Sequence, residues 1–250
     1  MRWGIAFALA LAAIWFGFVD NTWLDRRPVH RLLFLGHSYT YYNDMPAMVA
    51  KMADSANSPI RFDITMSAFP NATLEDHWNN RKTRQLLSQG GWYRVIAQPE
   101  GGLSLRDADS PMFVNGRRLL IGTAEQPPAI VISWQATEGF SQKHYSMSRA
   151  EVAAVEQNNL RDLAIATGAD VIDIARVWDR VQATDLPFSL YKDGNHPSLE
   201  GSYLAALVVY AGLSYADATA VTYVPWGMSS DHAALLRGRV QAALTTDSSP

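Results

Sequence analysis

Residues 32–40 read Leu32-Leu33-Phe34-Leu35-Gly36-His37-Ser38-Tyr39-Thr40. The four apolar residues form an unbroken run, which predicts a strand buried on both faces of a parallel sheet. A polar turn follows it, and helical spacing of apolar side chains begins after Asp44, the expected N-cap. A strand, a turn and a helix in this order predict the first unit of an α/β fold.

The rest of the chain repeats this alternation. Four more short apolar segments predict strands, namely residues 62–66, 93–97, 129–132 and 171–174. The helical patterns between and after them include residues 148–167, with Gly168 as the expected left-handed stop, and a later helix with Pro197 in its first turn. Strands separated by helices predict a parallel sheet of about five strands with helices on both faces.

Composition excludes several classes of protein. The chain has 250 residues, which fits a single domain, and its formal net charge of −3 comes without a basic block that could bind nucleic acid. It contains no cysteine, so disulfides, thiolate metal sites and a cysteine nucleophile are all absent. No zinc-protease, phosphate-loop or dinucleotide motif is present either, so no metal or organic cofactor is expected.

The N-terminus is a separate segment. Arg2 precedes an uncharged apolar run over residues 3–19, which Asp20 ends. A basic tip followed by such a run is typical of a signal peptide or a membrane anchor, here assigned to residues 1–22. A buried N-terminal helix remains the alternative. Either main interpretation predicts that the domain over residues 31–244 is exported or membrane-anchored, with residues 3–19 contacting the membrane if they are not cleaved.

Ser38 occupies a position where chemistry is expected. In open parallel sheets, ligands bind beyond the carboxyl ends of the strands, and Ser38 follows the first predicted strand directly. Backbone N–H groups at the start of the next helix can stabilise an oxyanion there. A serine at such a turn can also be no more than a helix cap.

The segment Asp193-Gly194-Asn195-His196-Pro197 supplies a candidate base. An aspartate three residues before a histidine can accept a hydrogen bond from Nδ1–H, which leaves Nε2 free to take a proton. A serine nucleophile needs such a base because its hydroxyl is hardly ionised at neutral pH. The alternative is a solvated turn in which His196 acts as a cap.

Together, the Gly-x-Ser turn near the start and the Asp-x-x-His-Pro turn near the end resemble the SGNH/GDSL hydrolase superfamily over roughly residues 31–212. The resemblance implies a three-layer α/β/α sandwich of flavodoxin-like type. It also implies that Ser38 is the nucleophile, His196 the base and Asp193 the residue that orients His196.

The middle of the chain departs from the family pattern. The family's oxyanion hole usually takes a glycine N–H and an asparagine side chain, and the matching positions here hold Asn71 and Gln98. The resemblance therefore implies an oxyanion hole made by Ser38, Asn71 and Gln98. The residue before the serine is usually Asp or Asn, whereas this chain has His37.

Three further residues are candidate substrate contacts, namely His37, Tyr39 and His144, the last of which is placed in a loop after the fourth strand. The segment Glu75-Asp76-His77 is interpreted as a solvated helix start, with His77 as a candidate for the lining of the cleft, because three consecutive side chains cannot face one metal ion.

The implied activity is that of a serine ester hydrolase that removes a small acyl group. The expected partner is a small-molecule or carbohydrate ester, for example an acetylated sugar. Two alternatives stay open: an O-acyltransferase on the same scaffold, and a non-catalytic glycan-binding module. No sequence feature indicates an oligomeric state.

Overall fold

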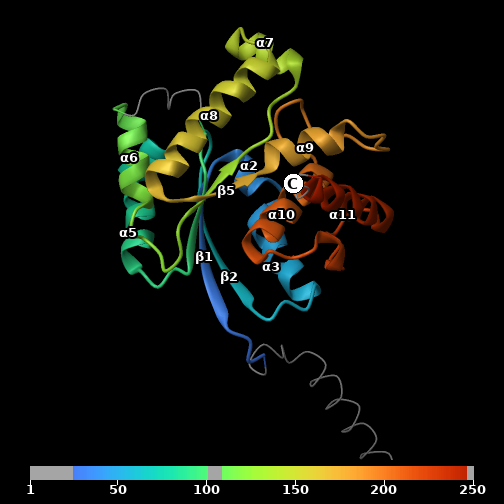
Figure 1. Ribbon diagram of the computed structural model, residues 1–250, viewed down its shortest axis with the longest axis horizontal. Helices are drawn as coiled ribbons and strands as arrows, with labels where there is room; N and C mark the ends of the chain where they lie inside the picture. The colour runs from blue at the N-terminus through green and yellow to red at the C-terminus, as the bar shows by residue number, and fades with distance from the viewer. Residues whose placement is uncertain (1–24, 101–108, 247–250) are drawn as a thin grey trace, which may run out of the picture.

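The structure is a computed structural model that describes residues 25–100 and 109–246 (Figure 1). The predicted signal peptide or anchor over residues 1–22 lies outside these ranges. Within them, no helix combines the length and the apolar composition needed to cross a membrane.

A parallel sheet of five strands forms the centre of the domain. The strands are β1 (Val29–Gly36), β2 (Arg61–Ala68), β3 (Arg94–Gln98), β4 (Ala129–Ile132) and β5 (Asp170–Asp173). Their order is β2-β1-β3-β4-β5, with every pair parallel. This is the flavodoxin-like order, in which the switch point lies between β1 and β3. The predicted fold class is confirmed.

Helices cover both faces of the sheet, and the described ones are α2 (Ser38–Tyr41), α3 (Met45–Ser55), α4 (Leu74–Asn79), α5 (Arg81–Gln89), α6 (Pro111–Leu120), α7 (Glu138–Tyr145), α8 (Arg149–Thr167), α9 (Ile174–Gln182), α10 (Leu199–Ser214) and α11 (Ser230–Thr245). Figure 1 shows α5, α6 and α8 on one side of the sheet and α3, α10 and α11 on the other.

The alternation of side chains along β1 explains the two layers. Leu32 and Phe34 belong to the core packed against α3, α9, α10 and α11. Leu33 and Leu35 point the other way and pack with residues of α4, α6 and α8. Because successive strand residues face opposite sides, a continuous apolar run is what a strand covered on both faces requires.

Local signals fix some helix ends as expected and not others. Gly168 ends α8 in the left-handed region at φ 66°, as predicted, and Ser148 caps the start of the helix by accepting the Glu151 N–H. Asp44 does precede α3, but its φ of 53° is left-handed and its side chain makes no capping bond. Asp44 is therefore the N-cap residue that the sequence predicts, but without a side-chain hydrogen bond to the helix.

The sequence predicted Pro197 in the first turn of the last long helix, but α10 begins after it, at Leu199. Ser198 is the N-cap and accepts the Gly201 N–H at 3.0 Å. Pro197 pairs instead with Tyr191 in an isolated antiparallel bridge. This bridge closes the loop that carries Asp193 and His196, so the proline fixes the loop rather than the helix.

Gly201 lets α10 approach this loop closely. A Cβ at position 201 would overlap the Leu190 carbonyl oxygen and lie 2.7 Å from Trp178 Cη2. Gly238 in α11 is a matched control, since a Cβ there would meet no atom within 4 Å. We expect Gly201→Ala to lower the free energy of unfolding by about 1–3 kcal/mol through overpacking. We expect Gly238→Ala to raise it by about 0.5–1 kcal/mol. Urea unfolding of both variants measures this, and equal effects would contradict the packing.

Candidate active site

Ser38 is the first residue of α2, directly beyond the carboxyl end of β1, and it is buried. His37 is the N-cap residue, with an extended backbone, and its carbonyl accepts the Thr40 N–H at 3.0 Å. Gly36 makes this tight turn possible, because a methyl group at that position would overlap the Thr40 side chain. The strand and the short helix thus hold the serine at the sheet edge where the sequence placed it.

Asp193 and His196 form the contact that their spacing predicted. Asp193 Oδ2 lies 2.9 Å from His196 Nδ1, and Oδ1 accepts the backbone N–H groups of Asn195 and His196 at 3.1 and 2.7 Å. Burial alone would raise the pKa of Asp193, but these hydrogen bonds outweigh it and lower the pKa. Because an ionised carboxylate only accepts, His196 Nδ1 carries the proton and Nε2 is the basic nitrogen.

The two turns, far apart in sequence, meet at this edge. The Tyr39 hydroxyl donates to Asn195 Oδ1. The Tyr42 ring stacks on the His196 imidazole, with centroids 4.5 Å apart and planes 8° from parallel. Tyr39 also approaches the imidazole edge-on at 6.1 Å. Two residues that follow Ser38 therefore contact the loop that carries the candidate base.

A stack of buried aromatic rings stabilises the contact between the serine turn and the loop that carries His196. The Tyr39 ring stacks on Trp134 at 4.4 Å, and Trp134 stacks on Trp178 at 4.5 Å. Trp134 Nε1 donates to the Asn195 carbonyl at 3.2 Å. Burial, followed by the charge of Glu100, raises the pKa of Tyr39, so its hydroxyl keeps its proton and remains a donor.

Asn71 and Gln98, which the sequence predicts for the oxyanion hole through a backbone N–H and a side-chain amide, lie at the same edge. Asn71 has φ 53°, the left-handed conformation that its residue type tolerates, in the turn that follows β2. Gln98 ends β3 beside Gly36. Its Oε1 accepts from Thr40 at 2.7 Å and its Nε2 donates to Ser133 at 2.8 Å. An amide nitrogen has two N–H donors, so Gln98 has at most one left for an oxyanion.

His37 is buried beside the serine. Burial, followed by repulsion from His196 and His77, lowers its pKa to about 3. Its Nδ1 lies 3.1 Å from Glu100 Oε2, outside hydrogen-bond geometry. A cavity of about 30 Å³ adjoins His37 and Tyr39, and its wall includes Glu100 and Glu156. His37 therefore adjoins the site as an uncharged side chain.

His77 corrects the interpretation of Glu75–His77 as a solvated helix start. Thr73 and Asp76 form a capping box at the exposed start of α4, but His77 is fully buried. Its Nε2 lies 3.1 Å from the Gly36 carbonyl oxygen. The capping box fixes where α4 begins, and the i, i+3 spacing from buried Leu74 is the sequence signal that places His77 on the inner face.

His144 lies on α7 rather than in a loop, which corrects its predicted setting. It is exposed and stacks on Phe140, with ring centroids 4.0 Å apart. Its role as a substrate contact stays a prediction. Across residues 25–100 and 109–246, no group of three or more acidic or histidine side chains is arranged to hold a metal ion.

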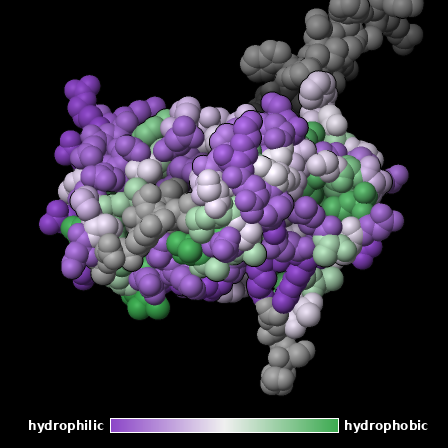
Figure 2. All heavy atoms as spheres, turned by 90° about the horizontal axis from the view of Figure 1, so that it is seen from above, coloured by the Kyte–Doolittle hydropathy of each residue, from purple (hydrophilic) through white to green (hydrophobic). Residues whose placement is uncertain are grey.

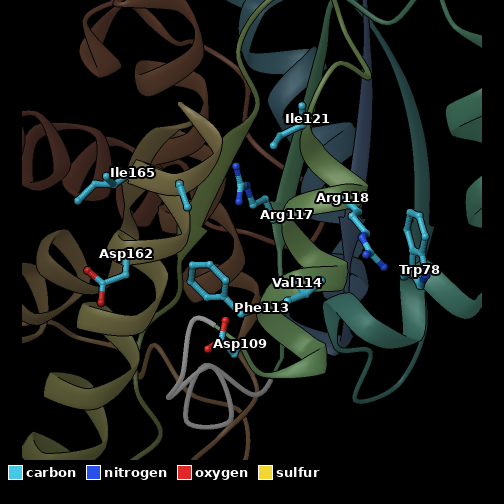
Figure 3. Close-up of a pocket in the computed structure, with 10 residues that line it drawn as sticks. Trp78, Asp109, Phe113, Val114, Arg117, Arg118, Ile121, Asp162 and Ile165 are labelled. Carbon is cyan, nitrogen blue, oxygen red and sulfur yellow. The ribbon is translucent and has the colours of Figure 1, made fainter.

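A groove of about 980 Å³ lies elsewhere, between α4, α6 and α8. Figure 3 shows Phe113 and Arg117 of α6 pointing toward α8, with Trp78 of α4 on the other side of α6. The described residues that line this groove include neither Ser38 nor His196. The candidate active site is therefore the sheet edge where the two turns meet, and not this groove.

Comparisons with known proteins extend this description. No model of a known protein family and no curated protein sequence matches the chain. Among solved structures, it is similar to a DUF4886 family protein from Bacteroides uniformis, with TM-score 0.70 and 16% identity over 87% of this chain and 95% of that one. It is also similar to a candidate SGNH hydrolase from Slackia heliotrinireducens, with TM-score 0.57 and 26% identity over 74% of this chain and 99% of that one.

A third similar structure is Axe2, an acetylxylan esterase from Geobacillus stearothermophilus, with TM-score 0.58 and 16% identity over 77% of this chain and 98% of that one. The strand order and the two turns at the carboxyl edge of the sheet define a flavodoxin-like fold. The likeness to the candidate SGNH hydrolase agrees with the SGNH hydrolase superfamily that the sequence motifs predicted.

Removing the Tyr39 hydroxyl tests the junction between the turns. Tyr39→Phe keeps the ring stack on Trp134 but leaves Asn195 Oδ1 without its donor. We expect it to lower the free energy of unfolding by about 1–2 kcal/mol. We also expect ester turnover to fall about tenfold, because the imidazole is less well placed. Tyr41→Phe on the same helix is the control, and equal behaviour of the two variants would argue against the junction.

Burial of His37 also predicts how stability depends on pH. Its folded-state pKa of about 3 lies below the ordinary value of about 6.5. Below that ordinary value the unfolded chain binds a proton that the folded chain does not, so stability falls as pH falls from about 6.5 toward 3, by up to about 1.4 kcal/mol per pH unit.

Urea midpoints between pH 7.5 and 4.5 measure this effect. We expect His37→Asn to flatten the decline and His144→Asn, on the exposed face of α7, to leave it unchanged. Identical slopes for wild type and His37→Asn would show that His37 does not cause the decline.

Proposed function

We propose that the protein is a serine ester hydrolase that uses Ser38, His196 and Asp193. The observation that carries the proposal is the meeting of the two turns, in which Tyr39 and Tyr42 of the serine turn contact Asn195 and His196. The Asp193–His196 contact at 2.9 Å supports it, because it leaves Nε2 as the basic nitrogen.

The reaction follows from these roles. Ser38 Oγ attacks the ester carbonyl while His196 Nε2 takes its proton, and the imidazolium then gives that proton to the leaving alcohol. Asp193 holds the imidazole in the required tautomer and stabilises its positive charge. A water molecule then attacks the acyl-enzyme, with His196 again as the base, and releases the acid. No step needs a cofactor.

The oxyanion hole is assigned to the backbone N–H groups of Ser38 and Asn71 and to the remaining N–H of the Gln98 amide. The left-handed backbone at Asn71 supports its part, because the turn takes the conformation that a family glycine would take. Removal of one such donor typically costs about 10²–10³ in turnover.

A small acyl group on a carbohydrate is the substrate class we favour. Axe2 is an acetylxylan esterase, and a serine-to-alanine variant of it is described as a catalytic mutant, which supports both the acyl group and the serine. Apart from the atoms drawn in grey, the face seen in Figure 2 is mainly hydrophilic, with separate hydrophobic patches. Such a surface suits a polar leaving group better than a lipid. Export or membrane anchoring through residues 3–19 fits a polysaccharide substrate and is part of the proposal.

A fluorophosphonate probe tests the nucleophile. We expect the wild-type protein to be labelled at Ser38 and Ser38→Ala to remain unlabelled, because the probe reacts only with a serine that a base activates. Ser88→Ala, at an exposed position at the end of α5, is the control and keeps full labelling. Peptide mapping by mass spectrometry identifies the labelled residue.

Equal labelling of wild type and Ser38→Ala would remove Ser38 from this role. Absence of labelling in a folded wild-type protein would favour the non-catalytic glycan-binding alternative. Product analysis with competing sugar alcohols separates hydrolysis from acyl transfer, since both reactions pass through the same acyl-enzyme.

A further inference from the structure

A chain of buried polar side chains lies beneath the candidate site. Ser67 Oγ lies 2.8 Å from Thr83 Oγ1, and Thr83 Oγ1 lies 3.2 Å from His77 Nδ1. His77 Nε2 lies 3.1 Å from the carbonyl oxygen of Gly36. All three side chains are buried, so each has to find its partners inside the protein.

The directions of these hydrogen bonds are fixed. A carbonyl oxygen only accepts, so His77 Nε2 carries the proton and donates to Gly36. Burial lowers the pKa of His77, which favours the uncharged ring, and its Nδ1 then accepts from the Thr83 hydroxyl at 3.2 Å. The same hydroxyl has a second, longer contact of 3.4 Å to Asn80 Oδ1, which already accepts the Thr83 backbone N–H. Ser67 in turn donates to Thr83. Each hydrogen bond in this series therefore donates in the same direction, from Ser67 of β2 through Thr83 of α5 and His77 of α4 to the Gly36 carbonyl at the end of β1.

Gly36 is the point where both turns of the oxyanion hole meet. Its carbonyl also accepts the N–H of Phe69 at 3.3 Å, two residues before Asn71. The Phe69 ring packs on His77, with centroids 4.8 Å apart. On the other side, Gly36 is two residues before Ser38. His77 thus contacts the backbone that carries the Ser38 N–H and the segment that carries the Asn71 N–H.

We propose that His77 is a positioning residue that fixes the spacing of the Ser38 and Asn71 N–H groups by holding the Gly36 carbonyl. This inference rests on the proposed function, since it concerns the same oxyanion hole. An error of about 1 Å in such a geometry costs about a hundredfold in rate. Because the effect arises where charge develops in the transition state, it changes kcat and leaves KM nearly unchanged.

Three variants separate this role from simple packing. His77→Leu fills the space but donates nothing to Gly36. His77→Gln can place an amide N–H near the Gly36 carbonyl and an amide oxygen near Thr83. Thr83→Val removes the hydroxyl that holds Nδ1 while keeping the side-chain shape. Each is compared with wild type for kcat and KM on p-nitrophenyl acetate, for the rate of fluorophosphonate labelling at Ser38, and for its thermal midpoint, with the kinetics at a temperature where that variant is folded.

We expect His77→Leu to lower kcat and the labelling rate by at least about tenfold with KM within about twofold, and His77→Gln to recover most of that loss. The kcat and the labelling rate of Thr83→Val are expected to lie between those of His77→Leu and His77→Gln. A folded His77→Leu with wild-type kcat and labelling would overturn the positioning role. If His77→Leu does not fold, Thr83→Val decides: a lower kcat and a lower labelling rate support the positioning role, and wild-type values of both overturn it.

The two proposals fail in different ways. If the folded wild-type protein is not labelled, the proposed function fails. If it is labelled at Ser38 and the folded His77 and Thr83 variants react at the wild-type rate, only the positioning role fails. Nitrogen-15 NMR of the His77 imidazole in the wild-type protein adds a readout that is independent of turnover. The hydrogen bonds from Thr83 to His77 and from His77 to Gly36 require a single neutral tautomer with the proton on Nε2.

Discussion

The junction between Tyr39 and Asn195 is the constraint on which the site depends. Tyr39 follows the candidate nucleophile in sequence, and Asn195 precedes the candidate base. Their hydrogen bond and the stack of Tyr39 on Trp134 join two loops that nothing in the local sequence brings together. A buried aromatic ring is well suited to this task, because it supplies both packing area and one directed polar contact.

Polar groups buried around this junction explain why the edge has a single geometry. The Thr40 hydroxyl donates a hydrogen bond to Gln98 Oε1. The Thr83 hydroxyl lies within hydrogen-bond distance of His77 Nδ1. A buried polar group without a partner costs about 1–3 kcal/mol, so competing arrangements of the turns lose stability. The same burial keeps His37 and His77 uncharged, and it links the stability of the site to pH.

Much of the fold could be predicted because its signals are local. The apolar run at β1, the Ser148 cap and the Gly168 stop act over a few residues, as does the Asp193–His196 contact. Three features depend on contacts between distant segments: the contact of His77 with the Gly36 carbonyl, the hydrogen bonds of Gln98 to Thr40 and Ser133, and the bridge formed by Pro197. Residue type and spacing carry little information about such contacts, so these features could be found only from the structure.

A crystal structure of the protein with a phosphonate bound covalently to Ser38 is the most direct measurement of whether the two turns form one catalytic unit. It should place His196 Nε2 within about 2.6–3.2 Å of Ser38 Oγ. The phosphonate oxygen should lie about 2.7–3.1 Å from the N–H groups of Ser38 and Asn71. An imidazole turned away from the adduct, or beyond hydrogen-bond reach of it, would contradict the catalytic assignment while leaving the fold intact.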